Sequence, residues 1–154
     1  VWQTRPKSNG YVKINSKNIH EPPIINPNYL SDPYDVDVLL KSIRIGKKFL
    51  STSQLQPYLN GQANPSNDIQ NDDELLSWAR SEGITVYHMI GTAKMGPKSD
   101  KMAVVNNELQ VRGIDSLRVA DASIMPSMPS GNTNAPTMMI AEKASDMILG
   151  KLLN

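Results

Sequence analysis

The stretch YHMIGTAKMG, residues 87–96, follows a short apolar run and contains two glycines and several other small residues. Its histidine, His88, stands where the chain leaves that run, as it would at the end of a strand emerging from a core. Histidine can take up or release a proton near neutral pH, which acid–base catalysis requires. A lone histidine is more often a hydrogen-bonded structural residue, so this stretch leaves both interpretations open.

A second stretch, SGNTNAPT at residues 130–137, predicts the start of a helix. Pro136 suits the first helical position, and Thr133 or Asn134 could cap the helix. Capping needs only one such side chain, so with Asn132 present as well the segment has more polar side chains than a cap requires. A buried helix N-terminus carries unpaired N–H groups and a partial positive charge, and it therefore favours an anionic group. The apolar residues that follow predict that the first half of this helix is buried.

Between these stretches, Asp121 and Ala122 follow a short predicted strand at residues 117–120. A carboxylate at a strand end could bond to a cofactor hydroxyl, or it could simply close a turn. The pattern alone does not separate these two interpretations.

Composition excludes several classes of protein. The chain has 154 residues, a formal net charge of +1 and no cysteine, so it predicts neither a nucleic-acid surface nor a disulfide or thiolate metal site. No apolar run approaches the roughly 18 residues that a membrane span needs, and we expect no membrane partner. The chain starts with neither an initiator Met nor a signal peptide, so we expect a fragment or a processed piece, and the compartment stays open.

Helical periodicity predicts two further helices. The first runs from about Asp32 to Leu50, with Asp32 as cap and Pro33 at the first helical position. The second covers residues 73–82, capped by the preceding Asn or Asp and ended by Gly83.

Alternation and turn residues predict short strands at 11–14, 84–87, 109–112 and 117–120. The proline-rich residues 15–31 and the polar residues 51–70 are expected to be extended or looping.

Taken together, the motifs resemble the glucose–methanol–choline (GMC) family of flavin-dependent oxidoreductases. Residues 88–96 resemble its catalytic-histidine segment, residues 107–126 its second signature region, and residues 131–144 its terminal flavin-contacting helix. The likeness spans nearly the whole chain, because residues 5–12 and 27–32 look like the start of the family's C-terminal region. Its detail is most similar to insect members of the glucose dehydrogenase type.

The resemblance implies an α+β fold: an antiparallel sheet with packed helices, which is the family's substrate-binding domain, plus the C-terminal strand and helix of the FAD domain. Residues 1–95 would belong to the substrate-binding domain and residues 96–154 would supply the closing segments. The chain would thus be a fragment of a larger fold.

The resemblance also implies an enzyme that moves a hydride from an alcohol, which could be a sugar, to FAD. His88 would be the catalytic base, and Asn132 would be a second catalytic residue that bonds the substrate oxygen. Asp121 and Ala122 would lie by the ribityl–pyrophosphate part of FAD, and Asn132, Thr133 and Asn134 by the flavin ring. The electron acceptor would be oxygen or a quinone-like compound.

One family feature is missing. The Gly-rich fingerprint G-x-G-x-x-G, which holds the nucleotide, occurs nowhere in the chain. We therefore expect an N-terminal FAD-binding region as a partner, and weak or no FAD binding by this polypeptide alone.

Two alternatives remain open at this point. One is a lyase with the same fold, of the cyanohydrin-cleaving kind, in which FAD performs no net redox step. The other is a truncated, non-catalytic binding or structural module.

Overall fold

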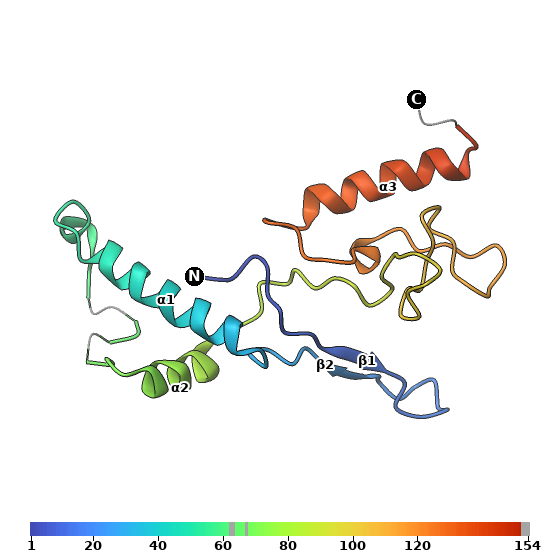
Figure 1. The fold of residues 1–154 in the computed structure, drawn as a ribbon. Coiled ribbons are helices and arrows are strands. Elements are labelled where there is room, and N and C mark those ends of the chain that lie inside the picture. Colours follow the sequence, from blue (N-terminus) through green and yellow to red (C-terminus); the bar gives the residue numbers. More distant parts are fainter. Residues whose placement is uncertain (62–63, 67, 152–154) are drawn as a thin grey trace. The chain divides into compact units, whose positions relative to one another are not determined.

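The computed structural model describes residues 1–61, 64–66 and 68–151, and these residues divide into two units (Figure 1). The first unit comprises Val1–Gly10 and Ile25–Val86. The second comprises Tyr11–Ile24 and the chain from Tyr87 onward. A two-stranded sheet pairs β1 (Tyr11–Lys13) with β2 (Ile24–Asn26). The described residues combine α-helices with this small sheet, as expected for an α+β fold.

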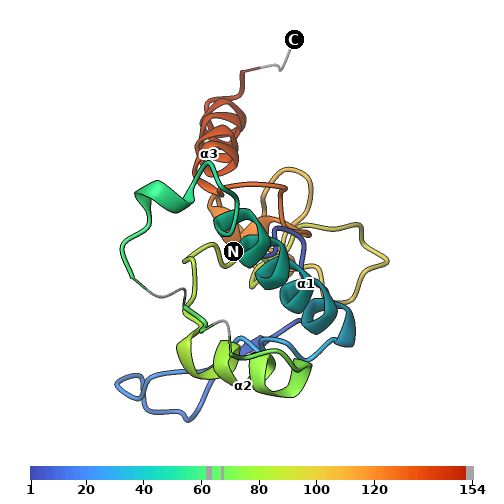
Figure 2. The same cartoon turned by 90° about the vertical axis from the view of Figure 1, so that its left-hand side faces the viewer.

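The first unit is built on two helices that form its core. Helix α1 (Pro33–Leu50) begins with Pro33, and the Asp32 carboxylate accepts a hydrogen bond from the Tyr34 N–H at 2.8 Å. Helix α2 (Asp72–Glu82) packs against α1 (Figure 2). The buried side chains between them are Leu40, Ile43, Leu75 and Ala79. Both helices confirm the predictions from periodicity and capping, since Asn71 caps α2 and Gly83 ends it.

The second unit carries helix α3 (Asn134–Ile148) on a core of short, irregular segments. A single 3-10 turn, η2 (Ala122–Ile124), contacts α3. The buried members of this core are Val105, Leu109, Ile124, Met125, Ile140 and Ala144. No helix of the described residues is long and apolar enough to cross a membrane.

The strand predictions were mostly wrong. Residues 11–14 contain β1, and β2 lies within residues 15–31, the segment expected to be extended or looping. Residues 84–87 form no strand, and the segments at 109–112 and 117–120 form only isolated bridges, Val105 with Val111 and Gln110 with Arg118. A strand needs a hydrogen-bonded neighbour along its length, and the described chain supplies these segments with a neighbour at one or two residues only.

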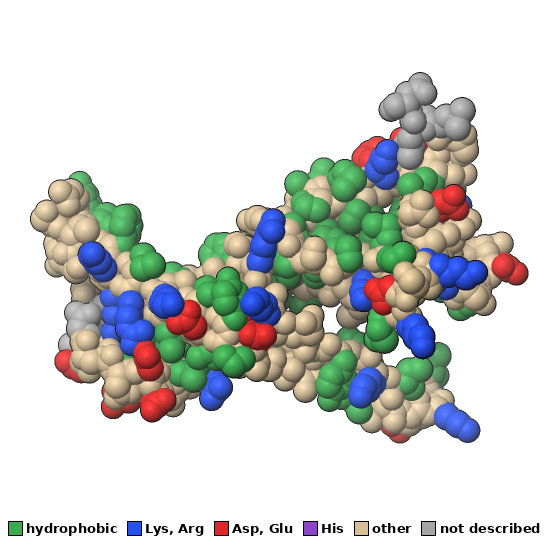
Figure 3. All heavy atoms as spheres, viewed as in Figure 1, with side chains coloured by type: hydrophobic (Ala, Val, Ile, Leu, Met, Phe, Trp, Pro, Cys, Tyr) green, Lys and Arg blue, Asp and Glu red, His purple; other side chains and the backbone are tan. Residues whose placement is uncertain are grey.

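The start of α3 also differs from its prediction. The helix begins at Asn134, two residues before Pro136. Its first half is not buried, because Met138 and Met139 are 61% and 55% exposed. Figure 3 shows hydrophobic side chains on the surface over α3. Only the face with Ile140 and Ala144 packs on the core, so the described residues leave the opposite apolar face uncovered.

A buried carboxylate anchors the N-terminal arm to α1. Asp35 is 2% exposed and accepts hydrogen bonds from the backbone N–H groups of Lys7 (2.9 Å) and Ser8 (2.7 Å) and from the Gln3 amide (2.9 Å). Burial raises the pKa of Asp35, but the hydrogen bonds from Ser8, Lys7 and Gln3 together lower it by more, so the pKa lies below its ordinary value of 3.8. The folded state therefore favours the charged carboxylate.

This anchor predicts a pH-dependent loss of stability in Asp35→Asn. At neutral pH the free energy of unfolding of the variant should be about 2–4 kcal/mol lower than that of the wild type, because a buried network of charge-assisted hydrogen bonds is broken. The folded pKa is depressed, so the stabilisation is complete above the unfolded pKa and is lost as pH falls through the folded pKa. The difference from wild type should shrink in acid.

Urea denaturation followed by Trp fluorescence, at pH 7 and below pH 4, measures this difference. Asp37→Asn is the matched control on the same helix, because Asp37 is half-exposed and forms a surface ion pair with Lys41 at 2.8 Å. Its effect should stay below about 0.5 kcal/mol. Equal losses for the two variants would contradict the role of Asp35.

Candidate functional site

The strip that carries His88 lies beside the segment that carries Asp121. The Ala93 N–H donates to the Ser123 carbonyl at 3.0 Å, and the Met95 N–H donates to the Ile124 carbonyl at 2.7 Å. His88 itself is half-buried, so its imidazole remains reachable from solvent. Two predicted parts of the site are thus brought together by backbone hydrogen bonds. We call residues 88–96 the His88 strip.

A glycine three residues after His88 turns the strip. Gly91 has φ of +82°, a region that L side chains rarely adopt, and an added Cβ would lie 3.4 Å from the Met125 carbonyl oxygen. A side chain at Gly91 would therefore be strained by the backbone conformation, while its Cβ would meet the segment after η2 at ordinary contact distance.

The hydrophobic core joins the third predicted part to the other two. Ile90 and Met95 of the His88 strip pack against the cluster that contains Ile124 from η2 and Ile140 from α3. The segments bearing His88, Asp121 and the start of α3 consequently share one core within one unit.

Asp121 caps the 3-10 turn that follows it. Its carboxylate accepts a hydrogen bond from the Ser123 N–H at 2.8 Å, and the side chain is exposed. Ala122 is half-buried and packs against the core. Asp121 therefore closes a turn, which was one of the two interpretations of the sequence, and its exposure leaves the carboxylate open to further partners.

The N-terminus of α3 has no side-chain cap. Thr133 occupies the capping position and is 9% exposed, but it makes no capping hydrogen bond, and its carbonyl accepts from the Thr137 N–H and hydroxyl. Asn134 is the first helical residue and is exposed, as is Asn132. Thr133 thus takes the capping position that the sequence offered it, but without a capping hydrogen bond from its side chain, and Asn134 lies inside the helix. The first N–H groups of α3 consequently have no partner in a capping side chain.

In the described part of the chain, the two predicted catalytic side chains, His88 and Asn132, are not in direct contact through a hydrogen bond. Among the described residues, no hydrogen bond joins the His88 imidazole to the Asn132 amide. The two segments share a core, and cooperation between these two side chains stays a prediction.

A cavity of about 440 Å³ lies elsewhere in the second unit and is lined mostly by residues 110–118, with Lys98 and Asn106. None of the predicted site residues lines it. No group of described residues could hold a metal ion.

Sequence reasoning missed an ion pair that borders the His88 strip. Lys94 Nζ lies 2.7 Å from Asp100 Oδ2, and the pKa of Asp100 is lowered chiefly by the hydrogen bond from Lys94 and then by one from the Met102 N–H. Opposite charges six residues apart around Pro97 are a weak signal for such a pair, because the turn between them has to be known first.

Comparison with curated proteins returns oxidoreductases. The chain is 42% identical over 147 residues to an alcohol dehydrogenase [acceptor] of Pseudomonas putida, covering 96% of this chain and 26% of that protein. It is also 42% identical over 150 residues to the mitochondrial choline dehydrogenase of Mus musculus, covering 97% of this chain and 25% of that protein. The chain therefore spans about a quarter of the length of the curated relatives it matches.

Solved structures match over almost the whole chain. An FAD-dependent oxidoreductase from Chaetomium thermophilum superposes with a TM-score of 0.87 at 29% identity, covering 97% of this chain and 26% of that one. A formate oxidase of Aspergillus oryzae, studied for its FAD modification, gives a TM-score of 0.84 at 29% identity, covering 96% of this chain and 26% of that one.

A family model for the C-terminal region of GMC oxidoreductases matches residues 6–141. These residues include the His88 strip, η2 and the first half of α3. The chain belongs to the GMC oxidoreductase family, whose matching members are FAD-dependent.

Proposed function

We propose that this chain is the C-terminal part of an FAD-dependent oxidoreductase that oxidises an alcohol. The observation that carries the proposal is the family match over residues 6–141, in which His88, Asp121 and the start of α3 belong to segments that share one core. Relatives named as alcohol and choline dehydrogenases support a CH–OH donor.

His88 is proposed as the catalytic base. Oxidation of an alcohol needs a group that accepts the hydroxyl proton, and imidazole does this near neutral pH. Asn132 is proposed as the second catalytic residue, because its amide can orient the substrate oxygen but cannot act as a base. Both side chains are accessible, since His88 is half-buried and Asn132 is exposed.

FAD, when bound, supplies the acceptor for the hydride that leaves the alcohol carbon. The residues proposed to hold it are Asp121 and Ala122 at the ribityl–pyrophosphate part, and Asn132, Thr133 and Asn134 at the ring. The donor set fits this cofactor, because α3 begins without a capping side chain and its N-terminus favours negative charge. The exposed Asp121 carboxylate can accept a hydrogen bond from a hydroxyl.

The division of the chain within the parent enzyme is part of the proposal. Residues 1–95 would belong to the substrate-binding domain and residues 96–154 to the closing segments of the FAD domain. An N-terminal region with the Gly-rich fingerprint would complete the cofactor site. The donor would be a sugar if the likeness to insect glucose dehydrogenases holds, and the acceptor would be oxygen or a quinone-like compound.

Anaerobic mixing of the FAD-loaded full-length protein with alcohols tests the reaction type. The panel should contain glucose, choline, simple primary alcohols and a cyanohydrin, and the visible flavin absorbance should bleach with at least one of the alcohols. Cleavage of the cyanohydrin without bleaching would indicate the lyase alternative. Stoichiometric FAD without bleaching or turnover across a wider panel would indicate a non-catalytic module.

A further inference from the structure

Residues 93–96 of the His88 strip lie between two other backbone segments. On one side, Ala93 and Met95 donate to Ser123 and Ile124 of η2. On the other side, the Lys94 carbonyl accepts a hydrogen bond from the Val104 N–H at 2.9 Å, and Met95 forms an isolated parallel β-bridge with Val105. The strip is therefore hydrogen-bonded to η2 on one side and to the chain around residue 104 on the other.

The turn between the strip and Val104 folds around the Asp100 carboxylate. Oδ1 accepts from the Met102 N–H at 2.9 Å, while Oδ2 lies 2.7 Å from Lys94 Nζ. The Ala103 N–H donates to the Asp100 carbonyl at 3.0 Å. One carboxylate thus binds the turn's own backbone and a side chain of the His88 strip.

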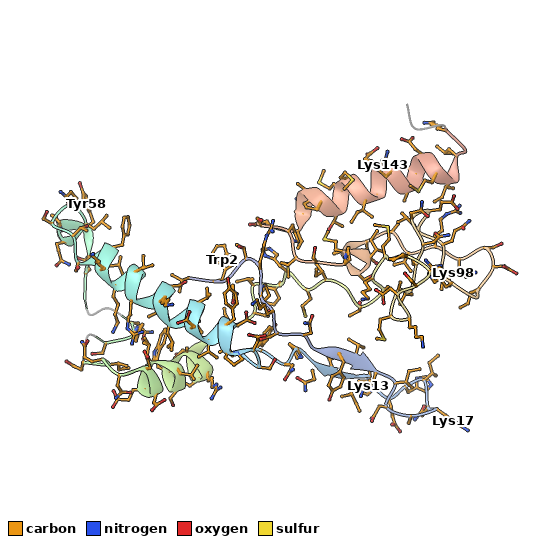
Figure 4. All side chains as sticks on the ribbon, in the orientation of Figure 1. Trp2, Lys13, Lys17, Tyr58, Lys98 and Lys143 are labelled. Atoms are coloured by element: carbon orange, nitrogen blue, oxygen red, sulfur yellow. The ribbon has the colours of Figure 1, made fainter. Side chains whose placement is uncertain are left out.

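The turn packs tightly against the strip at Gly96. A Cβ there would lie 2.9 Å from the Ala103 Cβ and 3.3 Å from Asp100 Oδ2, so only glycine allows this approach without a shift. The Arg112 guanidinium forms a second contact, because it donates a hydrogen bond to the Gly96 carbonyl at 2.7 Å. Lys98 lies in this loop region (Figure 4). The turn therefore contacts the end of the His88 strip both through close packing at Gly96 and through hydrogen bonds.

The setting of this ion pair distinguishes it from an ordinary surface pair. Its two side chains are each 33% exposed, whereas those of the Lys41–Asp37 pair on α1 are 68% and 53% exposed. Exposed pairs on a helix contribute little, because solvent screens them and both side chains must be ordered. Lys94 and Asp100 instead connect the turn to the His88 strip through their side chains, beside the backbone hydrogen bonds and the Arg112–Gly96 contact that also join these segments.

We propose that Lys94 and Asp100 are positioning residues whose ion pair holds the His88 strip in register against η2. The proposal rests on the proposed function for its catalytic consequence, because a shifted strip would move His88 relative to the residues at the start of α3. Neither Lys94 nor Asp100 is proposed to touch substrate or cofactor.

Two readouts test the pair in the FAD-loaded full-length protein. In Lys94→Ala, the amides of Ala93 and Met95 should exchange with solvent about tenfold faster, because their hydrogen bonds to η2 open more often. The rate constant for flavin reduction should fall about 5- to 20-fold with little change in substrate affinity, since misplacement affects the reaction more than binding. Lys94→Arg should restore both, and Asp100→Asn, which keeps an acceptor for the Met102 N–H, should reproduce the loss.

Lys41→Ala breaks the exposed pair on α1 and should change neither readout. Combining Lys94→Ala with Asp100→Asn should be no worse than either alone if the two residues act as a pair. Unchanged exchange at Ala93 and Met95 would overturn the proposal, and so would losses equal to those of Lys41→Ala. If no alcohol reduces the wild-type flavin, the proposed function fails, while the exchange measurement still decides the positioning role.

Discussion

Replacement of His88 by alanine is expected to lower the rate of flavin reduction by an alcohol about 10²-fold or more in the FAD-loaded full-length protein. Loss of a positioned general base usually has an effect of this size, because the hydroxyl proton must then leave to water. The half-buried imidazole can meet both substrate and solvent, and the strip behind it is held by the hydrogen bonds to Ser123 and Ile124. The variant should therefore keep its fold and its cofactor.

Stopped-flow reduction under anaerobic conditions measures the rate constant directly. Asn132→Ala should cost less than His88→Ala, because an amide that orients the substrate oxygen removes no proton. His20→Ala is the matched control, since His20 is exposed in the loop between β1 and β2 and lies outside the proposed site. A rate unchanged in His88→Ala, or lowered equally by His20→Ala, would remove His88 from the proposed mechanism.

The helices could be predicted because their signals are local. Asp32 and Pro33 start α1 within two residues, Asn71 starts α2, and apolar residues at helical spacing mark the face that packs. Each signal lies inside the element that it predicts, so no knowledge of the rest of the chain was needed.

The predictions of the strands and of the burial of α3 were wrong because both features depend on other parts of the chain. Residues 84–87 and 117–120 have strand-like alternation, but alternation becomes a strand only beside a hydrogen-bonded neighbour, which the sequence does not identify. Met138 and Met139 are apolar without being buried, because burial depends on what covers the helix. Hydrophobic pattern predicts which face needs a partner, and a neighbouring segment has to provide it.

The segments of the candidate site could be singled out from the sequence, whereas the contacts that support them could not. His88, Asp121 and Asn132 could be singled out by residue type and by resemblance, and the structure places their segments on one core. The Lys94–Asp100 pair has no such signature, because it arises from a turn that returns the chain to the strip. Supporting contacts of this kind depend on the path of the backbone and become visible only when that path is known.

The second large effect concerns the cofactor. The 154-residue chain alone is expected to bind FAD at least about 10³-fold more weakly than the full-length protein, a difference of about 4 kcal/mol. The residues proposed to contact FAD lie at η2 and at the start of α3, and they address the ring and the ribityl–pyrophosphate part. The chain contains no G-x-G-x-x-G, so it offers the adenosine half no Gly-rich turn and no acid for the ribose.

A comparison of FAD with FMN makes this expectation specific. If the chain contacts only the flavin end, the adenosine half adds nothing, and the two cofactors should bind the isolated chain with equal, weak affinity. The full-length protein should prefer FAD strongly. Titration followed by flavin fluorescence measures both affinities, and circular dichroism on the same samples checks that α1, α2 and α3 remain folded. Tight, stoichiometric FAD binding by the isolated chain, or a clear preference for FAD over FMN, would mean that these residues form a nucleotide site without the fingerprint.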